Sequence, residues 1–472
     1  MSQFLSDAFL PHVPTFIQLF YLLAMSLFIF GIKKLSSPAT ARSGNQMAAM
    51  GMLLGVAVTL FDQEILTFEF IIAGMAVGGI LGFFAARSVA MTAMPEMVAI
   101  FNGFGGGASA LVAWGEFSRA DISLWAGQDL ATAGLGIMIG SLTFTGSFIA
   151  FGKLQGFISG RPVTFPGQNY FNLLLTGVIL ILVGWFVTDP SNLTIFWSIF
   201  GLSLLLGVFT VLPIGGADMP VVISLLNSYS GLAASMAGFV ISNNLLIISG
   251  ALVGAAGLIL TNIMCKAMNR TLGNVLFGAF GGGGEARAAE ETGGKSVNKT
   301  TADDVAIQCS YADKVVIVPG YGLAVAQAQH ILKEVAGMLE KKGVTVKYGI
   351  HPVAGRMPGH MNVLLAEADV PYDQLYDMDQ INPEFKSTDV VLVIGANDVV
   401  NPAAKTSPGS PIYGMPILDV EQARRSIVFK RSLSPGFAGI DNELFYADDN
   451  QMFFGDAKQS LQDLAVAIKE LE

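Results

Sequence analysis

Charged residues are scarce in this chain of 472 residues: Asp, Glu, Lys and Arg make up only 13% of it, against 52% hydrophobic residues. A soluble protein of this length needs more charge to cover its surface, so most of the chain is expected to lie in lipid. The formal net charge of -10 comes without a basic stripe, which argues against nucleic acid as a partner. Residues 1–270 hold only nine of the 26 Lys and Arg residues, so the soluble surface is expected C-terminal to them.

Cysteine and histidine are also rare. Cys265 and Cys309 are the only cysteines, which excludes a disulfide framework and is compatible with a reducing cytoplasm. None of the four histidines lies in an apolar segment, so the chain cannot ligate a haem pair or an iron–sulfur cluster within a bilayer. No metal site is predicted. No cleavable signal is evident, because the first apolar stretch lacks a preceding basic region.

Nine apolar segments could cross a hydrocarbon core of about 30 Å. They lie at residues 15–32, 46–61, 66–86, 97–114, 130–152, 171–188, 193–212, 219–240 and 243–266. The second and fourth are rich in Gly, Ala and Ser, which favours packing against other helices rather than lipid. Residues 1–270 are therefore predicted to form a multi-span α-helical membrane bundle of about nine helices.

The positive charges of this region predict its orientation. Eight of its nine Lys and Arg residues lie in alternate connections or after the last segment, and only Arg119 lies on the other side. Positive residues favour the cytoplasmic side, so the N-terminus is expected outside and the C-terminal part in the cytoplasm. This alternation requires an odd number of segments, which supports nine independently of hydropathy.

The chain changes character after residue 270. Four glycines at 281–284 are followed by polar residues without apolar periodicity, so we assign 271–308 to a flexible linker. Residues 309–472 then form a cytoplasmic domain that is predicted to bind a nucleotide.

Short β-branched runs alternate with helical patterns in this C-terminal domain. Strands are predicted at 315–319, 344–350, 390–394 and 426–429, with helices at 324–341 and 360–367. Parallel strands joined by helices indicate an α/β, Rossmann-like, doubly wound parallel sheet.

A glycine motif, Gly320-x-Gly322-x-x-Val325, follows the first predicted strand directly. The glycines permit a tight turn and close approach of the backbone to a pyrophosphate at the start of a helix. An ordinary turn between a strand and a helix would show the same pattern. The motif alone therefore leaves both interpretations open.

The end of the second predicted strand bears on the choice of cofactor. Folds that bind NAD usually place an Asp or Glu there for the ribose 2′-hydroxyl, whereas this strand ends at Ile350-His351-Pro352 with Arg356 just beyond. Basic residues without a carboxylate favour the additional phosphate of NADP. Lys430-Arg431-Ser432 follows another strand and offers two cations and a hydroxyl to a phosphate, although a solvated strand end would look the same.

Several long segments resemble the β subunit of proton-translocating NAD(P)+ transhydrogenases. The resemblance is carried by residues 216–224, 226–231, 320–329, 351–368, 395–403 and 430–432. It covers nearly the whole chain. It implies an enzyme that moves a hydride between NAD(H) and NADP(H), coupled to proton passage across the bacterial inner membrane.

The same resemblance implies where the nucleotides bind. NADP(H) is expected on this chain, NAD(H) on a partner α subunit, and the complex is expected to be a dimer of αβ units in the lipid bilayer. The family binds its cofactor flipped on this sheet. The implied cofactor contacts are Gly320, Tyr321, Gly322, Ala324, Val325, Val353, Ala354, Gly355, Arg356, Gly395, Ala396, Asn397, Asp398, Lys430, Arg431 and Ser432.

Within this set the resemblance implies separate roles. The glycine loop and Arg356 hold the pyrophosphate region, and the cluster at 430–432 holds the 2′-phosphate. Asp398 lies near the nicotinamide as part of the coupling apparatus, although an acid in such a loop could equally serve a turn or a cap. Phe437 stands where relatives can carry Tyr, so a contact from that hydroxyl is lost.

Polar residues within membrane segments are costly and therefore tend to be functional. The proton-path candidates are Asn102, Asp218, Asn227 and Ser249, with Ser228 and Ser230 beside Asn227. Some family members carry a histidine at the position of Asn102, whereas Asn cannot titrate. The titrating group is therefore expected on membrane helices of the partner, with Asn102 and Asn227 orienting water beside it.

Two other classes of function remain open. One is a transporter or channel gated by nucleotide binding to a Rossmann sensor domain, which would bind nucleotide without turnover. The other is a membrane dehydrogenase that passes electrons to quinone, which would need a flavin, haem or iron–sulfur partner.

Overall fold

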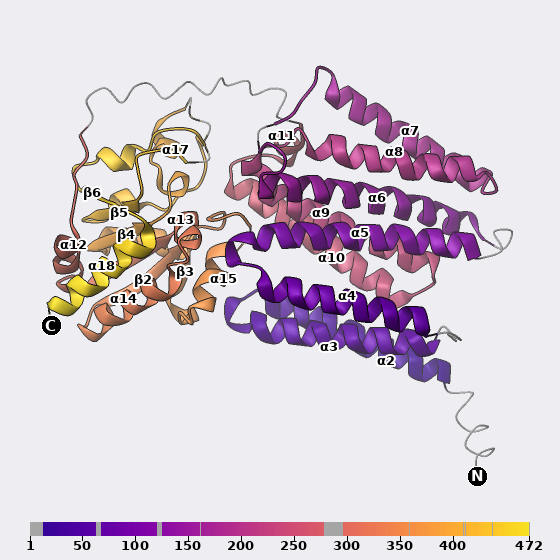
Figure 1. The fold of residues 1–472 in the computed structure, drawn as a ribbon, viewed down its shortest axis with the longest axis horizontal. Coiled ribbons are helices and arrows are strands. Elements are labelled where there is room, and N and C mark those ends of the chain that lie inside the picture. Colours follow the sequence, from indigo (N-terminus) through magenta and orange to yellow (C-terminus); the bar gives the residue numbers. More distant parts are fainter. Residues whose placement is uncertain are drawn as a thin grey trace, which may run out of the picture. The chain divides into compact units, whose positions relative to one another are not determined.

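The structure is a computed structural model that describes residues 13–62, 68–119, 125–160, 162–277, 296–357, 359–408, 410, 412–436 and 438–471. Residues group into two compact units. The first holds most of the chain up to Leu260, and the second holds Thr261–Glu472 together with Met91–Pro95 and Gly215–Val221. Element labels follow Figure 1.

Long helices make up the membrane part. They are α2 (Val13–Leu35), α3 (Pro38–Asp62), α4 (Glu69–Ser88), α5 (Met94–Arg119), α6 (Gly127–Gln155), α7 (Gln168–Thr188), α8 (Leu193–Val211), α9 (Met219–Val240) and α10 (Asn244–Ala267). Within the described part of the chain, eight of them are long and apolar enough to cross a membrane, all but α3. This confirms the predicted multi-span bundle.

Each of the nine predicted apolar segments overlaps one of these helices. Helix α3 falls outside the eight candidates for spanning, because a polar run at residues 38–46 opens it. It packs closely on α2: a Cβ added to Gly44 would lie 2.7 Å from the carbonyl oxygen of Gly31. That α3 itself crosses the membrane remains a prediction.

Helices α9 and α10 approach each other through small residues. A Cβ on Gly231 would lie 2.6 Å from the backbone nitrogen of Gly254, and one on Gly250 would lie 2.5 Å from that of Ser235. The Ser228 hydroxyl donates to the Gly254 carbonyl oxygen at 2.6 Å. Small residues allow helix backbones to meet in a membrane, and polar side chains then bond across the contact. We call this contact the α9–α10 seam.

The second unit is built on a six-stranded parallel sheet in the order β3-β2-β1-β4-β5-β6. Its strands are β1 (Lys314–Pro319), β2 (Thr345–Ile350), β3 (Leu375–Asp377), β4 (Val390–Ile394), β5 (Ser426–Lys430) and β6 (Asn450–Phe454). This is the order of a dinucleotide-binding doubly wound sheet, whose direction of winding reverses between β1 and β4. The predicted sheet class is therefore confirmed.

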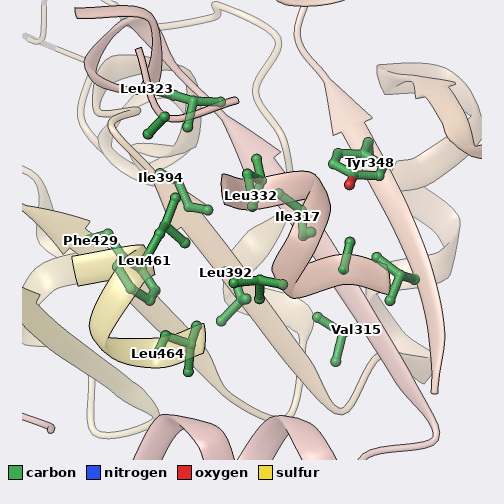
Figure 2. Packing of buried hydrophobic residues seen from close by; sticks show 14 of the residues in the cluster. Val315, Ile317, Leu323, Leu332, Tyr348, Leu392, Ile394, Phe429, Leu461 and Leu464 are labelled. Atoms are coloured by element: carbon green, nitrogen blue, oxygen red, sulfur yellow. The ribbon is translucent and has the colours of Figure 1, made fainter. Parts of the chain in front are cut away.

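Both faces of this sheet are buried, as parallel sheets require. Alternate residues of β1 and β4, such as Val315, Ile317 and Leu392, pack against α14 (Gln329–Lys341) and α18 (Ala457–Glu470), as Figure 2 shows. The residues between them pack on the other face. Side chains that alternate between two apolar layers explain why the strands read as continuous hydrophobic runs.

Short helices lie between these strands: α13 (Tyr321–Val325), α15 (His360–Glu367), α16 (Met378–Ile381) and α17 (Ala403–Thr406). Two further short helices, α11 (Leu272–Phe277) and α12 (Ala302–Ser310), precede β1. One predicted helix, 324–341, is wrong at its start, because it is divided into α13 and α14. Gln327 has φ of 48°, a left-handed conformation that ends a helical turn.

The predicted linker over 271–308 also needs correction at both ends. Helix α11 occupies 272–277, and residues 298–300 hydrogen bond to β6 before α12 begins at Ala302. Thr301 caps α12 by accepting a hydrogen bond from the Asp304 backbone nitrogen, so the polar composition marks a helix start rather than a linker. Residues 278–295 of this predicted linker lie outside the described residues.

Candidate functional site

The site is built where the sheet reverses its winding, at the carboxyl ends of β1 and β4. Gly320 donates its backbone N–H to Ile394 O at 2.8 Å, and Gly322 donates to Gly395 O at 2.9 Å. A Cβ on Gly320 would lie 2.4 Å from the backbone nitrogen of Ala396. Gly395 has φ of 71°, which favours glycine. The two loops therefore pack backbone to backbone at the switch point, where doubly wound sheets bind their ligands.

The glycine loop differs from the prediction in one respect. Helix α13, which it opens, is only five residues long. A helix of one turn and a half contributes little macrodipole, so binding at this loop has to come from its backbone and from neighbouring side chains. Ala324 is buried in the sheet core, whereas the side chain of Val325 is 47% exposed.

Arg356 is brought beside the glycine loop from the segment that follows β2. Its guanidinium carbon lies 4.5 Å from the centroid of the Tyr321 ring, a cation–π arrangement. The backbone N–H of Arg356 donates to Nδ1 of the fully buried His360 at 3.0 Å. Gly355 turns the chain at φ of 104°, and a Cβ there would lie 2.5 Å from the same nitrogen. Two aromatic side chains therefore fix the position of Arg356.

Substitution of His360 tests this positioning role. Asn places a side-chain oxygen near the position of Nδ1 and can still accept from Arg356, whereas Leu cannot. We expect His360→Leu to weaken NADP+ binding about tenfold, the equivalent of one lost hydrogen bond of about 1.4 kcal/mol. His360→Asn should retain most of the affinity in a calorimetric titration of the detergent-solubilised chain. Equal losses in both variants would contradict the assigned hydrogen bond.

His351, unassigned by the sequence, is a buried neutral side chain. Its Nε2 lies 2.8 Å from the Pro416 carbonyl oxygen, and its Nδ1 accepts from the Val353 backbone nitrogen at 3.2 Å. These partners require one protonated nitrogen and one bare nitrogen. Burial lowers the pKa of His351 from 6.5 to about 4, although the bond to Pro416 opposes this. His351 therefore shapes the loop and cannot serve as a cation for phosphate.

This lowered pKa predicts a pH dependence of stability. The unfolded chain binds a proton at His351 below about pH 6.5, whereas the folded chain does so only below about pH 4. Stability should therefore fall as the pH decreases through this window, by up to about 3 kcal/mol. Calorimetry of the solubilised protein should show this fall for the C-terminal unit. His351→Gln should reduce it, and an unchanged slope in that variant would contradict the assignment.

Asp398 lies in the loop after β4 and binds the loop after β5. Its Oδ2 accepts from the Ala438 backbone nitrogen at 3.0 Å. Gly436 packs so closely that a Cβ on it would lie 2.4 Å from Asp398 Oδ1. Asn442 Nδ2 donates to the carbonyl oxygen of Asn397 at 3.1 Å. The loop that follows β5 is therefore fastened to the Asp398 segment at several points.

Lys430 ends β5 directly beside this loop. Its Nζ lies 4.9 Å from the Phe445 ring centroid and donates to the Ser434 carbonyl oxygen. Burial lowers the pKa of Lys430, and the negative charges of Asp398 and Asp441 act in the opposite direction. Within the described residues Lys430 forms no ion pair of its own, so its charge is open to an anionic ligand.

The other two members of the predicted phosphate cluster lie on the surface. Arg431 is exposed and forms no ion pair with any described residue. The Ser432 hydroxyl lies 2.9 Å from that of Ser434. One half-buried cation, one exposed cation and two hydroxyls thus follow the same strand, an arrangement suited to a phosphate.

In the membrane part, helices α5 and α9 meet at two of the predicted polar residues. Asn102 Nδ2 donates to the Ile223 carbonyl oxygen at 3.2 Å. One turn later on α9 lies Asn227, and a Cβ on Gly105 would lie 3.8 Å from the Ser230 Cβ. Residues 223, 227 and 230 share one face of α9. The structure therefore places Asn102 and Asn227 at the same helix contact.

The other two predicted proton-path residues lie elsewhere. Asp218 ends a short 3₁₀ turn before α9 and forms an ion pair with Arg270 at 3.1 Å. Ser249, on α10, donates only to the Leu245 carbonyl oxygen of its own helix within the described part of the chain. Neither contacts Asn102 or Asn227 through a hydrogen bond between described residues.

The chain is similar along most of its length to one family of known proteins. A family model described as NAD(P) transhydrogenase beta subunit matches residues 17–467. The chain belongs to this family. Two relatives from Rhodospirillum rubrum, both named NAD(P) transhydrogenase subunit beta, are each 50% identical to it over 456 residues. Each match covers 95% of this chain and 98% of the relative.

As a transhydrogenase β subunit, the chain is part of an oxidoreductase and has an α subunit as its partner. Its eight candidate spans make it a membrane protein. The resemblance that the sequence suggested is therefore confirmed at the level of the family.

Sequence reasoning did not identify three of the residues that shape the site of this β subunit. His360, Asn442 and Ala438 each contact a predicted site residue through a hydrogen bond between a side chain and a backbone group that meet only in the folded chain. His360 lies nine residues after His351 within the same motif, and its burial at a helix start gives no pattern in sequence. Ala438 contributes only its backbone N–H, so no side-chain signal could have identified it.

Proposed function

We propose that this chain binds NADP(H) on its C-terminal sheet and exchanges a hydride with NAD(H) on the α subunit. The reaction is coupled to proton passage across the bacterial inner membrane, with the C-terminal unit in the cytoplasm and the complex a dimer of αβ units. Residues 1–270 form the membrane domain and 309–472 the nucleotide domain of this proposal, and residues 298–308 add to the latter a segment paired with β6 and the start of α12. The excess of positive residues on one set of connections supports this orientation.

The observation that carries the proposal is the packing of Gly320 against Ala396 at the switch point of the sheet. Here a Cβ is excluded at 2.4 Å, so glycine lets the two loops meet at the place where doubly wound sheets bind a dinucleotide. Arg356 lies beside this loop, and Lys430 ends the strand next to β4. We call the paired loops after β1 and β4, at Gly320–Gly322 and Gly395–Ala396, the cradle. Cations are therefore present on both sides of the cradle, and the residues fit a dinucleotide.

The choice of NADP rests on charge. No carboxylate follows β2, where His351 is neutral and bound to Pro416, so the usual acceptor for a ribose 2′-hydroxyl is absent from that described segment. Lys430, Arg431 and Ser432 instead offer charge-assisted hydrogen bonds to a 2′-phosphate. The geometry agrees with the flipped placement that the family resemblance implied, because these residues follow β5 rather than β2.

In this proposal the nicotinamide supplies the hydride, so the transfer step needs no nucleophile or general base from the protein. The chain's own residues hold and orient the nucleotide. Arg356 and the glycine loop fix the pyrophosphate region, and the loop after β5 excludes water from the end of the sheet.

Asp398 couples this site to proton movement in the proposal. Its carboxylate accepts from Ala438 N and faces Lys430, so a proton on it would remove the negative charge beside Lys430 and weaken the hydrogen bond from Ala438. The contact between the loop after β5 and the Asp398 segment would then depend on the protonation of Asp398.

We expect Asp398→Asn to slow coupled hydride transfer and proton uptake by at least tenfold while preserving the fold. Unchanged rates in reconstituted vesicles would remove Asp398 from the mechanism.

Nucleotide titration of the purified chain tests the assignment of the cofactor. We expect NADP+ to bind at least 100-fold more tightly than NAD+ to the detergent-solubilised subunit without its partner, because only NADP+ engages the cations after β5. Equal affinities would contradict the assignment. Binding without turnover in the assembled complex would favour a nucleotide-gated transporter, and reduction of quinone by NADPH would favour a dehydrogenase.

A further inference from the structure

A second polar cluster lies in the membrane part, at the opposite end of α10 from Lys266. The Tyr21 hydroxyl of α2 lies 3.1 Å from Thr59 Oγ1 of α3. Asn243, which directly precedes α10, points its Nδ2 at both hydroxyls, 3.3 Å from the first and 3.5 Å from the second. Tyr21 and Asn243 are only 7% and 6% exposed. Three helices thus meet at one buried polar group of three residues, which we call the outer cluster.

The surroundings of the outer cluster are apolar, with Ala24, Val58 and Leu245 packed around it. Polar groups in such a place cost free energy unless they are bonded to one another. Phe, Val and Leu could fill the same volume without that cost. Buried polar residues within membrane segments accordingly tend to be retained for function.

The amide of Asn243 has a fixed orientation. Its Oδ1 accepts from the Leu246 backbone nitrogen at 2.9 Å and caps the start of α10. The nitrogen is therefore committed as a donor to the two hydroxyl oxygens. Asn243 positions the hydroxyls of Tyr21 and Thr59 beside each other, but its amide does not take up or release a proton.

The bond between the two hydroxyls can run in either direction. Thr59 Oγ1 also lies 2.8 Å from the Gly55 carbonyl oxygen. When Thr59 donates to Gly55, Tyr21 can donate to Thr59, and when Thr59 turns toward Tyr21 the order reverses. A proton taken up from a water molecule at one hydroxyl oxygen is matched by release of that hydroxyl's own proton to the second hydroxyl, which passes its own proton to another water molecule at the outer end. Each hydroxyl gains one proton and loses one, so no net charge remains.

We propose that the outer cluster is a segment of the proton path, in which the hydroxyls of Tyr21 and Thr59 relay protons at the outer end of the bundle. This inference rests on the proposed coupling of hydride transfer to proton passage. The cluster lies at the ends of α3 and α10 that are remote from the Lys and Arg residues, which the charge pattern assigns to the outer side.

The α9–α10 seam leads from the polar contact of α5 and α9 toward the outer cluster. From Asn227 to the end of α9 at Val240 the helix rises about 20 Å. Along this length Ser228 and Ser235 bond to carbonyl oxygens of α10, the latter at 3.1 Å from Ile247 O. Asn243 follows on the turn to α10, where its backbone nitrogen bonds to Gly238 O at 2.8 Å. Polar groups therefore recur along the seam from the inner half to the outer end.

Paired substitutions in the assembled αβ complex test this relay. Tyr21→Phe and Thr59→Val each remove one hydroxyl, whereas Thr59→Ser retains it. Ser26→Ala serves as a matched control, since the Ser26 hydroxyl on α2 bonds, among the described residues, only to Leu22 O of its own helix. The readouts are proton uptake and reduction of an NAD analogue by NADPH, recorded in the same vesicles and normalised to the amount of assembled complex.

We expect Tyr21→Phe and Thr59→Val to slow proton uptake at least tenfold, with Thr59→Ser and Ser26→Ala within twofold of the unmodified complex. If Tyr21→Phe and Thr59→Val take up protons as fast as the unmodified complex, the relay is overturned while the proposed function stands. Lower thermal stability with normal proton uptake would also overturn it, since the cluster would then be a structural tie alone. If the unmodified complex transfers hydride without moving protons, the proposed coupling itself fails. If the Tyr21→Phe complex does not assemble, the difference in proton uptake between Thr59→Val and Thr59→Ser tests the relay.

Discussion

Replacing Gly320 with alanine should abolish NADP+ binding by the solubilised chain. The added Cβ would lie 2.4 Å from the backbone nitrogen and Cα of Ala396 and equally near the Gly395 carbonyl oxygen. These contacts are with backbone, so the loops after β1 and β4 would have to separate. Such overpacking costs roughly 1–3 kcal/mol in stability. The larger effect falls on binding, because the cradle between the loops exists only while the two backbones touch.

A second glycine provides the matched control for this substitution. Gly337 lies within α14, and a Cβ there would meet nothing within 4 Å. Gly337→Ala should therefore leave binding unchanged and raise stability by roughly 0.5–1 kcal/mol, the usual gain for alanine over glycine within a helix. Titration calorimetry with NADP+ and thermal unfolding measure both effects. Tight NADP+ binding by the Gly320 variant would show that the cradle does not hold the nucleotide.

The second large effect is expected at Lys430. Lys430→Met keeps most of the aliphatic stem but removes the half-buried charge that lies near Asp398 and over the Phe445 ring. A charge-assisted hydrogen bond is worth roughly 1.5–3 kcal/mol, so NADP+ affinity should fall by about 10- to 100-fold. NAD+ affinity should change much less, because NAD+ lacks the 2′-phosphate. The preference for NADP+ over NAD+ is therefore the quantity that should decrease.

Lys458 is the control for that change. It lies in the first turn of α18 on the surface of the same unit, and among the described residues only its backbone nitrogen forms a hydrogen bond outside the helix, with Asp456. Lys458→Met removes the same charge from the chain without altering the loop after β5. An equal loss of preference in the two variants would indicate a general electrostatic effect rather than a phosphate contact.

The sequence predicted the fold class and the switch point because both follow from local patterns. Apolar segments of sufficient length and β-branched runs followed by Gly320 and Gly322 are sufficient signals for a bundle and a doubly wound sheet. Strands β3 and β6 lacked comparable signals. β3 is three residues long and partly exposed, and β6 carries Asn450 and Gln451 at its start. Their pairing depends on neighbouring strands rather than on their own composition.

The contacts of the site itself could not be predicted in the same way. The position of Arg356 depends on a ring from α13 and a second ring from α15, and that of Asp398 on a backbone nitrogen at 438. Such contacts join segments far apart in the chain. The break in the predicted helix at Gln327 was also hidden, because glutamine rarely adopts a positive φ and carries no sign of it in sequence. Phe437, where relatives can carry Tyr, lies outside the described residues.

The membrane part shows the same limit. Polar residues in apolar segments were visible in the sequence, and the structure joins Asn102 to the helix that carries Asn227. Tyr21 and Thr59 were not singled out, since each lies near the end of a segment where a hydroxyl is common. The outer cluster is defined only in the folded chain, where Asn243, more than 180 residues later in the sequence, forms hydrogen bonds to both hydroxyls.

The central claim is that hydride transfer at the nucleotide site drives protons across the membrane. The most direct measurement records internal pH in vesicles that contain the αβ complex while NADPH reduces an NAD analogue. We predict a pH change that begins with the reaction, stops when NADPH is exhausted and collapses with a proton ionophore. Reduction of the analogue at an undiminished rate with no change of internal pH would contradict the account.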